Sequence, residues 1–351
     1  MHETMFKILK AYGIPDRLVS AIRLTYDKLK AKVSSPDGDT DYFKIYAGVM
    51  QGDTLAPFLF VIVLDYAMRS AIHGREEELG FTLQPRKSRR IAAKSICDLD
   101  FADDIVLLSN EIEQARKLVH SVEKECLKVG LKINAAKTKA TYFNVDVELI
   151  NTSDGVEIQQ AMTKQGDQDF RYLGSWCTKD RDIHTRKALA WKSLHKLNKV
   201  WTSGLPNASK LKLFRATTET ILTYGSSTWS LTTQEEKALD GTYTRMLRKV
   251  YNISWRDRVN NKTLYGSVRK LSDTIRIRRL KLAGHVFRDQ SSPAHLTITW
   301  MPAHGYAQRG RPPSSFIGTI LRDTNISTVE ELESCMRDRD IWREFSRCQL
   351  S

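Results

Sequence analysis

Apolar residues recur with helical spacing near the start of the chain, where Met5, Ile8, Leu9 and Tyr12 fall on one helical face. A Gly-Ile-Pro sequence then interrupts this pattern, as it commonly does at the end of a helix. Apolar, polar and turn-forming stretches divide the following segment in the same way. We predict two helices within residues 3–31, a hairpin over 32–47, a buried helix over 56–73, an exposed polar loop over 74–94 and an amphipathic helix over 111–129.

Short apolar runs of strand length predict a sheet in the same half of the chain. Runs at 95–101 and 105–109 flank two adjacent aspartates, which predicts an antiparallel hairpin with both faces covered. Further strands are expected near 138–143 and 170–176.

The second half of the chain is predicted to be mainly helical. Lys192, Lys196 and Lys199 share one helical face, and the opposite face carries apolar residues. Such a helix packs on a domain with its lysines directed either toward phosphate groups or simply toward solvent. Both interpretations stay open for this helix taken alone.

The composition is that of an ordinary globular protein, with 41% hydrophobic and 27% charged residues among 351. The longest apolar run, residues 55–64, contains Pro57 and is far shorter than the roughly 20 residues of a membrane helix. Five cysteines are scattered without the spacing of a zinc site, which favours reduced thiols. We therefore expect an intracellular chain that does not span a membrane.

The net charge of +14 is unevenly distributed along the chain. Residues 1–175 hold 24 basic and 25 acidic side chains, whereas residues 176–322 hold 27 basic and 9 acidic ones. A neutral first half joined to a strongly basic segment favours a polyanion such as nucleic acid as the partner.

The clearest chemical signal is the sequence FADDIVLLS at residues 101–109, in which Asp103 and Asp104 are adjacent in a predicted turn. Adjacent carboxylates repel each other, and a divalent cation relieves this repulsion. Hard oxygen ligands suit Mg²⁺, which supports phosphoryl-transfer chemistry. An Asp-Asp turn can also simply close a hairpin. Asp98 and Asp100 either add charge to this site or face solvent at the strand edge.

Four segments stand out in order along the chain: GVMQGDTLAPFLF at 48–60, FADD at 101–104, GLKINAAKTK at 130–139 and FRYLG at 170–174. In this order and spacing they resemble four motifs of reverse transcriptases of the non-LTR retrotransposon type. The second resembles the aromatic-x-Asp-Asp metal turn, and the fourth resembles the primer-grip hairpin. A weaker resemblance continues over residues 278–286 and 309–312.

The resemblance implies an α+β chain built from part of a right-hand polymerase. Residues 1–175 would be partial fingers and palm, an antiparallel sheet with packed helices. Residues 176–250 would be a helical thumb, and residues 251–351 a basic, mainly helical C-terminal extension. The implied activity is RNA-directed DNA polymerase, with Mg²⁺, dNTP, an RNA template and a DNA primer. The implied location is the nucleus or a cytoplasmic ribonucleoprotein.

The family's functional residues carry over position by position. Asp103 and Asp104 would bind the metal, and Phe101 would lie near the primer end. Lys137 would lie near the triphosphate and protonate the leaving pyrophosphate, unless it is a solvated lysine of a Lys-rich loop. Contact with the template or the incoming nucleotide would fall to Gln51 and Gly52, since glycine allows close backbone approach.

Arg309 and Arg311 flank a glycine and precede two prolines. Such arginines can enter a narrow minor groove, or they can form a basic loop before a helix that contacts phosphates.

One departure from the family bears on activity. Reverse transcriptases take a further metal-binding aspartate from a strand that would precede the first helix here, and no residue of this sequence matches it. Two-metal catalysis needs carboxylates on both sides of the metal pair. We therefore expect an N-terminally truncated polymerase whose activity is very weak or absent. The alternative is a non-catalytic remnant that binds nucleic acid through residues 176–322.

Overall fold

The computed structural model describes residues 2–27, 29–86, 88, 90, 92–143, 148–162, 170–298 and 315–348. The chain divides into two units, residues 1–168 and 169–351. Each unit has hydrophobic cores of its own, and each is described by itself. In these described ranges, no helix has the length and apolar character needed to cross a lipid bilayer.

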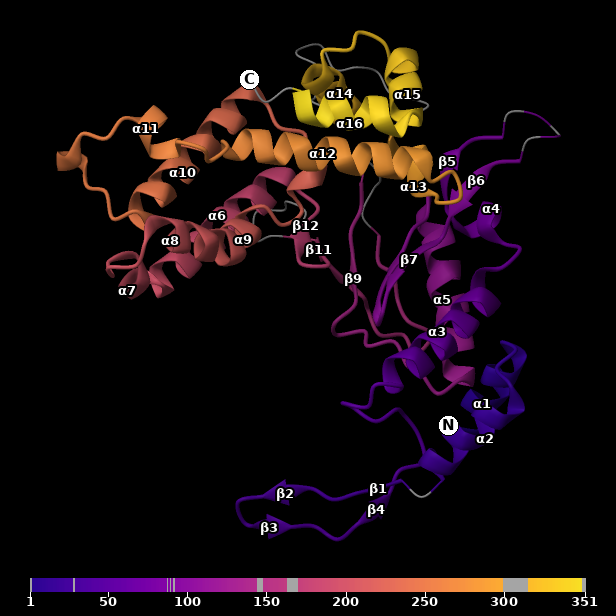
Figure 1. The fold of residues 1–351 in the computed structure, drawn as a ribbon. Helices are drawn as coiled ribbons and strands as arrows, with labels where there is room; N and C mark the ends of the chain where they lie inside the picture. The colour runs from indigo at the N-terminus through magenta and orange to yellow at the C-terminus, as the bar shows by residue number, and fades with distance from the viewer. Residues whose placement is uncertain are drawn as a thin grey trace. The chain divides into compact units, whose positions relative to one another are not determined.

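The first unit mixes helices with short strands (Figure 1). Its helices are α1 (His2–Ala11), α2 (Asp16–Tyr26), α3 (Ala56–Ile72), α4 (Glu76–Leu79) and α5 (Ile112–Lys128). Its strands are β1 (Lys30–Ala31), β2 (Ser34–Ser35), β3 (Gly38–Asp39), β4 (Phe43–Lys44), β5 (Phe81–Gln84), β6 (Lys94–Ile96), β7 (Asp98–Phe101), β8 (Asp104–Leu107), β9 (Lys139–Ala140) and β10 (Gln159–Gln160). The helices predicted within 3–31, 56–73 and 111–129 are confirmed. The expected burial of the second of these is wrong in part, because Phe58 and Val61 of α3 are 67% and 45% exposed.

The strands of this unit pair two by two. Antiparallel pairs join β1 to β4, β2 to β3, β5 to β6 and β7 to β8, whereas β9 and β10 pair in parallel. The hairpin predicted over 32–47 is confirmed, with its turn between Ser35 and Gly38. This mixture of helices and small sheets is of the α+β type, as predicted, and the naming of a palm stays a prediction.

The main core of the first unit lies between α3 and α5. Apolar residues of α3, among them Met68 and Ala71, pack against Leu118 and Val122 of α5. A capping box between Glu111 and Gln114 starts α5 and satisfies backbone groups that the helix leaves unpaired. Side chains of β8 and of the segment after α5 pack against the same core.

The predicted loop over 74–94 is wrong in part, because it contains α4 and β5. Within α4, Glu77 and Glu78 face solvent, while Leu79 is fully buried. Gly80 follows it and lies so close to Cys97 that a larger side chain would overlap the cysteine sulfur. The strand predicted over 138–143 is reduced to the two residues of β9.

Where the structure describes it, the second unit is helical apart from one hairpin, β11 (Arg171–Tyr172) with β12 (Ser175–Trp176). Its helices are α6 (Lys179–Lys196), α7 (Asn198–Trp201), α8 (Asn207–Phe214), α9 (Thr220–Leu222), α10 (Thr233–Val250), α11 (Asn261–Tyr265), α12 (Leu271–Arg288), α13 (Ala294–Ile298), α14 (Phe316–Thr324), α15 (Val329–Arg337) and α16 (Arg339–Cys348). A π-helical turn η1 (Arg215–Glu219) and 3₁₀ turns η2 (Ser226–Thr228) and η3 (Trp255–Asp257) join them.

Helix α12 runs through the middle of this unit, and α14 to α16 lie along one side of it (Figure 1). It also contacts α10, the η2 turn and α13. One core joins α6, α8 and α10 to the start of α12. A second core joins the rest of α12 to the four helices α13, α14, α15 and α16. The first core therefore includes residues on both sides of position 250. The division into a thumb over 176–250 and an extension over 251–351 stays a prediction.

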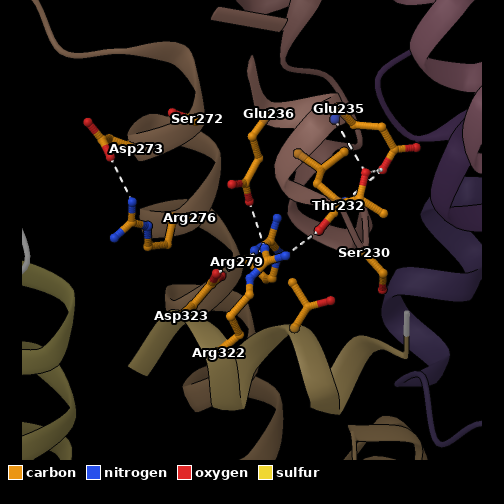
Figure 2. Close-up of polar contacts among 12 residues, drawn as sticks. Ser230, Thr232, Glu235, Glu236, Ser272, Asp273, Arg276, Arg279, Arg322 and Asp323 are labelled. Carbon is orange, nitrogen blue, oxygen red and sulfur yellow. Dashed lines mark hydrogen bonds and ion pairs between the residues drawn. The ribbon is translucent and has the colours of Figure 1, made fainter. Parts of the chain in front are cut away.

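Charged side chains connect three helices of this unit. Arg279 of α12 is 1% exposed and forms an ion pair with Asp323 of α14. Arg322 donates to Glu236 of α10 at 2.7 Å and to the carbonyl oxygen of Leu231 at 2.8 Å. Figure 2 shows this cluster between α10, α12 and α14. Because an unpaired buried charge is costly, the buried Arg279–Asp323 pair fixes how α12 meets α14.

Candidate metal-binding hairpin and nucleic-acid interface

The hairpin predicted around the two aspartates is confirmed. Strands β7 and β8 are antiparallel, Phe101 pairs with Asp104, and Ala102 and Asp103 form the turn. Ala102 has a φ of 57°, a conformation that alanine rarely adopts, so the turn is held by the strands on both sides. Asp103 and Asp104 are exposed at its tip, and Phe101 is 63% exposed.

The two faces of this hairpin differ. Ile105 and Leu107 lie on one face and pack against the core of α3 and α5. The other face carries Leu99 and Phe101 opposite Val106 and Asp104, and Leu99 is 45% exposed. The expectation that both faces are covered is therefore wrong, because Leu99 and Phe101 on this second face are 45% and 63% exposed.

Asp98 and Asp100 lie on the core-side face, opposite Leu107 and Ile105. Burial raises the pKa of both carboxyl groups. The pKa of Asp100 rises to about 7 because of burial, the negative charge of Asp98, their shared hydrogen bond and the charge of Asp65. Asp98 is half-buried, so the solvent-facing interpretation is wrong for it.

We expect Asp100→Asn to change the pH dependence of stability. A carboxyl group with a folded pKa near 7 and an unfolded pKa near ~4 binds its proton more tightly in the folded chain. The wild-type chain should therefore lose stability as pH rises from 4 to 7, and the variant should lose less. The free energy of unfolding can be measured by urea unfolding followed by circular dichroism. The difference, variant minus wild type, should be more positive at pH 8 than at pH 4. An equal difference at both pH values would contradict the prediction.

The Gln-Gly segment forms the entry to α3. Gly52 has a φ of 91°, which favours glycine, and the Asp53 carboxylate accepts a hydrogen bond from the Leu55 amide at 3.1 Å. Pro57 lies in the first turn of α3, where its missing amide leaves no intrahelical hydrogen bond unmade. Gln51 is exposed. The turn therefore presents Gln51 and Gly52 to solvent at the start of α3.

Lys137 lies in a turn after α5. Its backbone amide donates to the carbonyl oxygen of Asn134 at 3.0 Å, as does the amide of Thr138 at 2.9 Å. The Lys137 side chain is exposed. Leu131 and Ile133, which precede this turn, pack against the core that also holds β8 and α3.

The predicted polymerase residues of the first unit therefore stand on segments that share one core. Hairpin β7–β8, helix α3 and the segment before Lys137 all pack against it. In the part of the chain that the structure describes, no hydrogen bond or ion pair joins Asp103, Gln51 and Lys137. No group of three or more carboxylate, histidine or cysteine side chains lies close enough to hold a metal ion in these same residues.

The FRYLG segment belongs to the second unit and forms hairpin β11–β12. Leu173 and Gly174 form its turn, with φ values of 47° and 82°. The Tyr224 hydroxyl donates to the Leu173 carbonyl oxygen at 2.6 Å, and Arg186 donates to the Gly174 carbonyl oxygen. The hairpin is thus fixed to the helices of its own unit.

Asp182 is a buried residue of the second unit whose structural role the sequence did not reveal. It is 2% exposed and accepts hydrogen bonds from the Trp229 indole at 3.0 Å and from the Trp176 amide at 3.1 Å. Arg186 lies one helical turn further on, 3.4 Å from the Asp182 carboxylate. The i, i+4 spacing of Asp182 and Arg186 could have predicted their ion pair, but this spacing normally indicates a pair on the exposed surface of a helix.

The three predicted nucleic-acid-binding lysines are exposed, but they do not share one helix. Lys192 and Lys196 lie on α6, whereas Lys199 lies on α7. The two helices are separate because the Trp201 indole donates to the Leu194 carbonyl oxygen at 2.8 Å and so caps the end of α6. Two further predicted contacts, Arg309 and Arg311, lie outside the described residues.

Comparison with known proteins decides the family. A family model described as reverse transcriptase (RNA-dependent DNA polymerase) matches residues 1–177, just over half of the chain. The chain belongs to the reverse transcriptase family. Within this reverse transcriptase the match includes the Asp-Asp hairpin, the Gln-Gly turn and hairpin β11–β12.

The relatives place this reverse transcriptase with the non-LTR retrotransposon type. It is 29% identical over 136 residues to the Pol polyprotein of retrotransposable element R2DM of Drosophila melanogaster, and 31% identical over 109 residues to that of element R2 of Popillia japonica. These matches cover 39% and 31% of this chain but only 12% and 16% of the two polyproteins. An uncharacterised transposon-derived protein of Caenorhabditis elegans is 24% identical over 271 residues, or 72% of this chain and 96% of that protein.

Proposed function

We propose that the chain is the polymerase segment of a non-LTR retroelement, which copies an RNA template by extending a DNA primer. Hairpin β7–β8 would be the metal-binding corner of the palm, and the second unit would be the thumb and its extension. The observation that carries this proposal is the exposed pair Asp103 and Asp104 at a constrained turn, within the residues that match the family.

The donor set fits one side of a divalent-metal site. Asp103 and Asp104 would supply hard carboxylate oxygens to Mg²⁺. The bound ion would lower the barrier to attack by the primer 3′ hydroxyl and stabilise the leaving pyrophosphate. Phe101 would contact the primer end, and Lys137 would hold a proton near the triphosphate. Gln51 and Gly52 would position the template or the incoming dNTP.

We infer that this chain alone is a slow polymerase. Asp103 and Asp104 supply two carboxylates. Among the described residues, no third carboxylate, histidine or cysteine lies close enough to share a metal ion with them. Two-metal nucleotidyl transfer needs ligands on both sides of the metal pair. A second candidate, nucleic-acid binding without catalysis, is favoured by the exposed Lys192, Lys196 and Lys199 and by the +18 charge of residues 176–322.

Primer extension on an RNA template tests both candidates. We expect slow Mg²⁺-dependent extension that falls by more than about 100-fold in Asp103→Asn, because each metal carboxylate contributes several kcal/mol to the transition state. Asp37→Asn, on the distant turn between β2 and β3, should keep the wild-type rate. Binding of the primer–template should be the same in all three proteins.

The outcomes separate the candidates. Fast extension that depends on Asp103 would contradict the inference of a slow enzyme. Extension that is unchanged in Asp103→Asn would contradict the assignment of the site. Tight binding with no extension at all would favour the non-catalytic candidate.

A further inference from the structure

An open pocket of about 380 Å³ lies in the second unit, between the end of the α8–η1–α9 helix and α12. Thr220, Tyr224 and Ser227 line it from the first side, and Arg278 and Lys281 line it from α12. Hydroxyl groups and cations therefore face each other across the pocket, and its lining contains no carboxylate.

The two cations are available to a ligand. Arg278 is held in place by a hydrogen bond from Nη1 to the Thr223 hydroxyl at 2.6 Å and to the Thr223 carbonyl oxygen at 3.1 Å. Both Arg278 and Lys281 are exposed, and neither forms an ion pair with any residue that the structure describes. Guanidinium, ammonium and hydroxyl groups are the donors that contact nucleic-acid phosphates, and here the guanidinium is held in place.

Tyr224 adds a rigid aromatic surface beside these cations. The Arg186 guanidinium lies 4.4 Å from the centre of its ring, and its hydroxyl is held by the Leu173 carbonyl oxygen. Even so, 48% of the Tyr224 surface is exposed. An immobilised exposed ring next to a basic groove is the arrangement on which unpaired bases stack.

We propose that this pocket binds one segment of a single-stranded nucleic acid, with its phosphates on Arg278 and Lys281 and a base on Tyr224. The proposal rests on the nucleic-acid binding of the proposed function. The pocket is open to solvent, whereas small-molecule sites enclose most of the ligand surface. A strand that passes through the pocket therefore fits better than a free nucleotide. RNA and single-stranded DNA share the recognised chemistry, the sugar–phosphate backbone.

Salt titrations of binding to the full chain test this proposal. Labelled oligo(U) and oligo(dT) of about 16 nucleotides serve as probes in fluorescence anisotropy. The double variant Arg278→Gln/Lys281→Gln should lower the log–log salt slope by about 1.4, because two phosphate contacts at about 0.7 each are lost. The matched control Lys237→Gln/Lys262→Gln, which removes two exposed charges outside the pocket, should lower it by less than half as much. Arg278→Lys, which keeps the charge, should keep the slope.

The tyrosine is tested separately. Tyr224→Leu should weaken binding of both oligonucleotides about 10-fold without changing the salt slope. Tyr224→Phe keeps the ring and should keep the affinity within about twofold, which separates stacking from the role of the hydroxyl in holding Leu173.

Several results would overturn the proposal. If the pocket variants lose no more than the control while the wild type binds, the pocket is not the binding site and the proposed function stands. If the wild type binds neither probe, the proposed function fails along with the pocket. Displacement of the probes by inorganic phosphate at constant ionic strength would show a small-anion site instead.

Discussion

Replacing Arg279 with methionine is expected to lower the free energy of unfolding of the second unit by about 3–5 kcal/mol, because the Asp323 carboxylate would remain buried without its partner. Arg322 lies 3.5 Å from the same carboxylate and offsets part of this cost, so the lower end of the range is expected. The double variant Arg279→Met/Asp323→Leu should recover most of the lost stability, because replacing both partners with apolar side chains leaves neither of the two charges buried without its partner.

Tryptophan fluorescence during urea unfolding measures this effect in the full chain. All seven tryptophans lie in residues 169–351, so their emission reports on the second unit. Arg276→Met is the matched control on the same helix, because its ion pair with Asp273 is about one-third exposed. That variant should lose less than about 1 kcal/mol. Equal losses for both variants would contradict the importance of the buried pair.

Gly284→Ala is expected to lower the free energy of unfolding by about 3 kcal/mol. A methyl group at position 284 would overlap the Trp342 indole of α16, which is 3% exposed. The same indole donates a hydrogen bond to the Leu280 carbonyl oxygen at 2.7 Å, and a shift of the ring would break it. Displacement of α16 should also change the tryptophan emission spectrum of the folded chain.

Gly241→Ala provides a control of opposite sign. Gly241 lies inside α10 with no atom within 4 Å of the added methyl group. Alanine there should raise stability by up to about 1 kcal/mol, because it has the higher helix propensity. If Gly284→Ala and Gly241→Ala both stabilise the chain, the close packing of α16 on α12 does not require glycine at position 284.

Periodic patterns predicted the elements that place the site. The spacing of Leu118 and Val122 predicted α5, and the strand patterns around Asp103 predicted the hairpin with both aspartates at its turn. The motifs predicted the family, because four short segments in a fixed order are improbable by chance. The roles of Asp103, Asp104, Lys137, Gln51 and Gly52 stay predictions.

The pattern of apolar and polar residues did not predict which charged side chains are buried or which side of α12 faces its neighbours. Arg278 and Arg279 are adjacent in sequence, yet one is exposed and the other is 1% exposed. Only the rotation of α12 against α14 decides which arginine meets Asp323. Asp182 was missed for the same reason, since its partners Trp229 and Trp176 come from other segments. The sequence therefore did not predict the buried polar contacts that join the segments of the second unit.

The π-helical turn Arg215–Glu219 has a consequence for sequence comparison. A π turn contains one residue more than an α turn, and each helical residue rotates the side chains that follow by about 100°. Helices α8 and α9 continue into each other through this turn, so its extra residue sets the direction of Thr220 and Tyr224 relative to Phe214. A relative with a one-residue gap at this turn would direct different side chains toward α12. In an alignment, that single gap would distinguish chains that share the pocket from chains that do not.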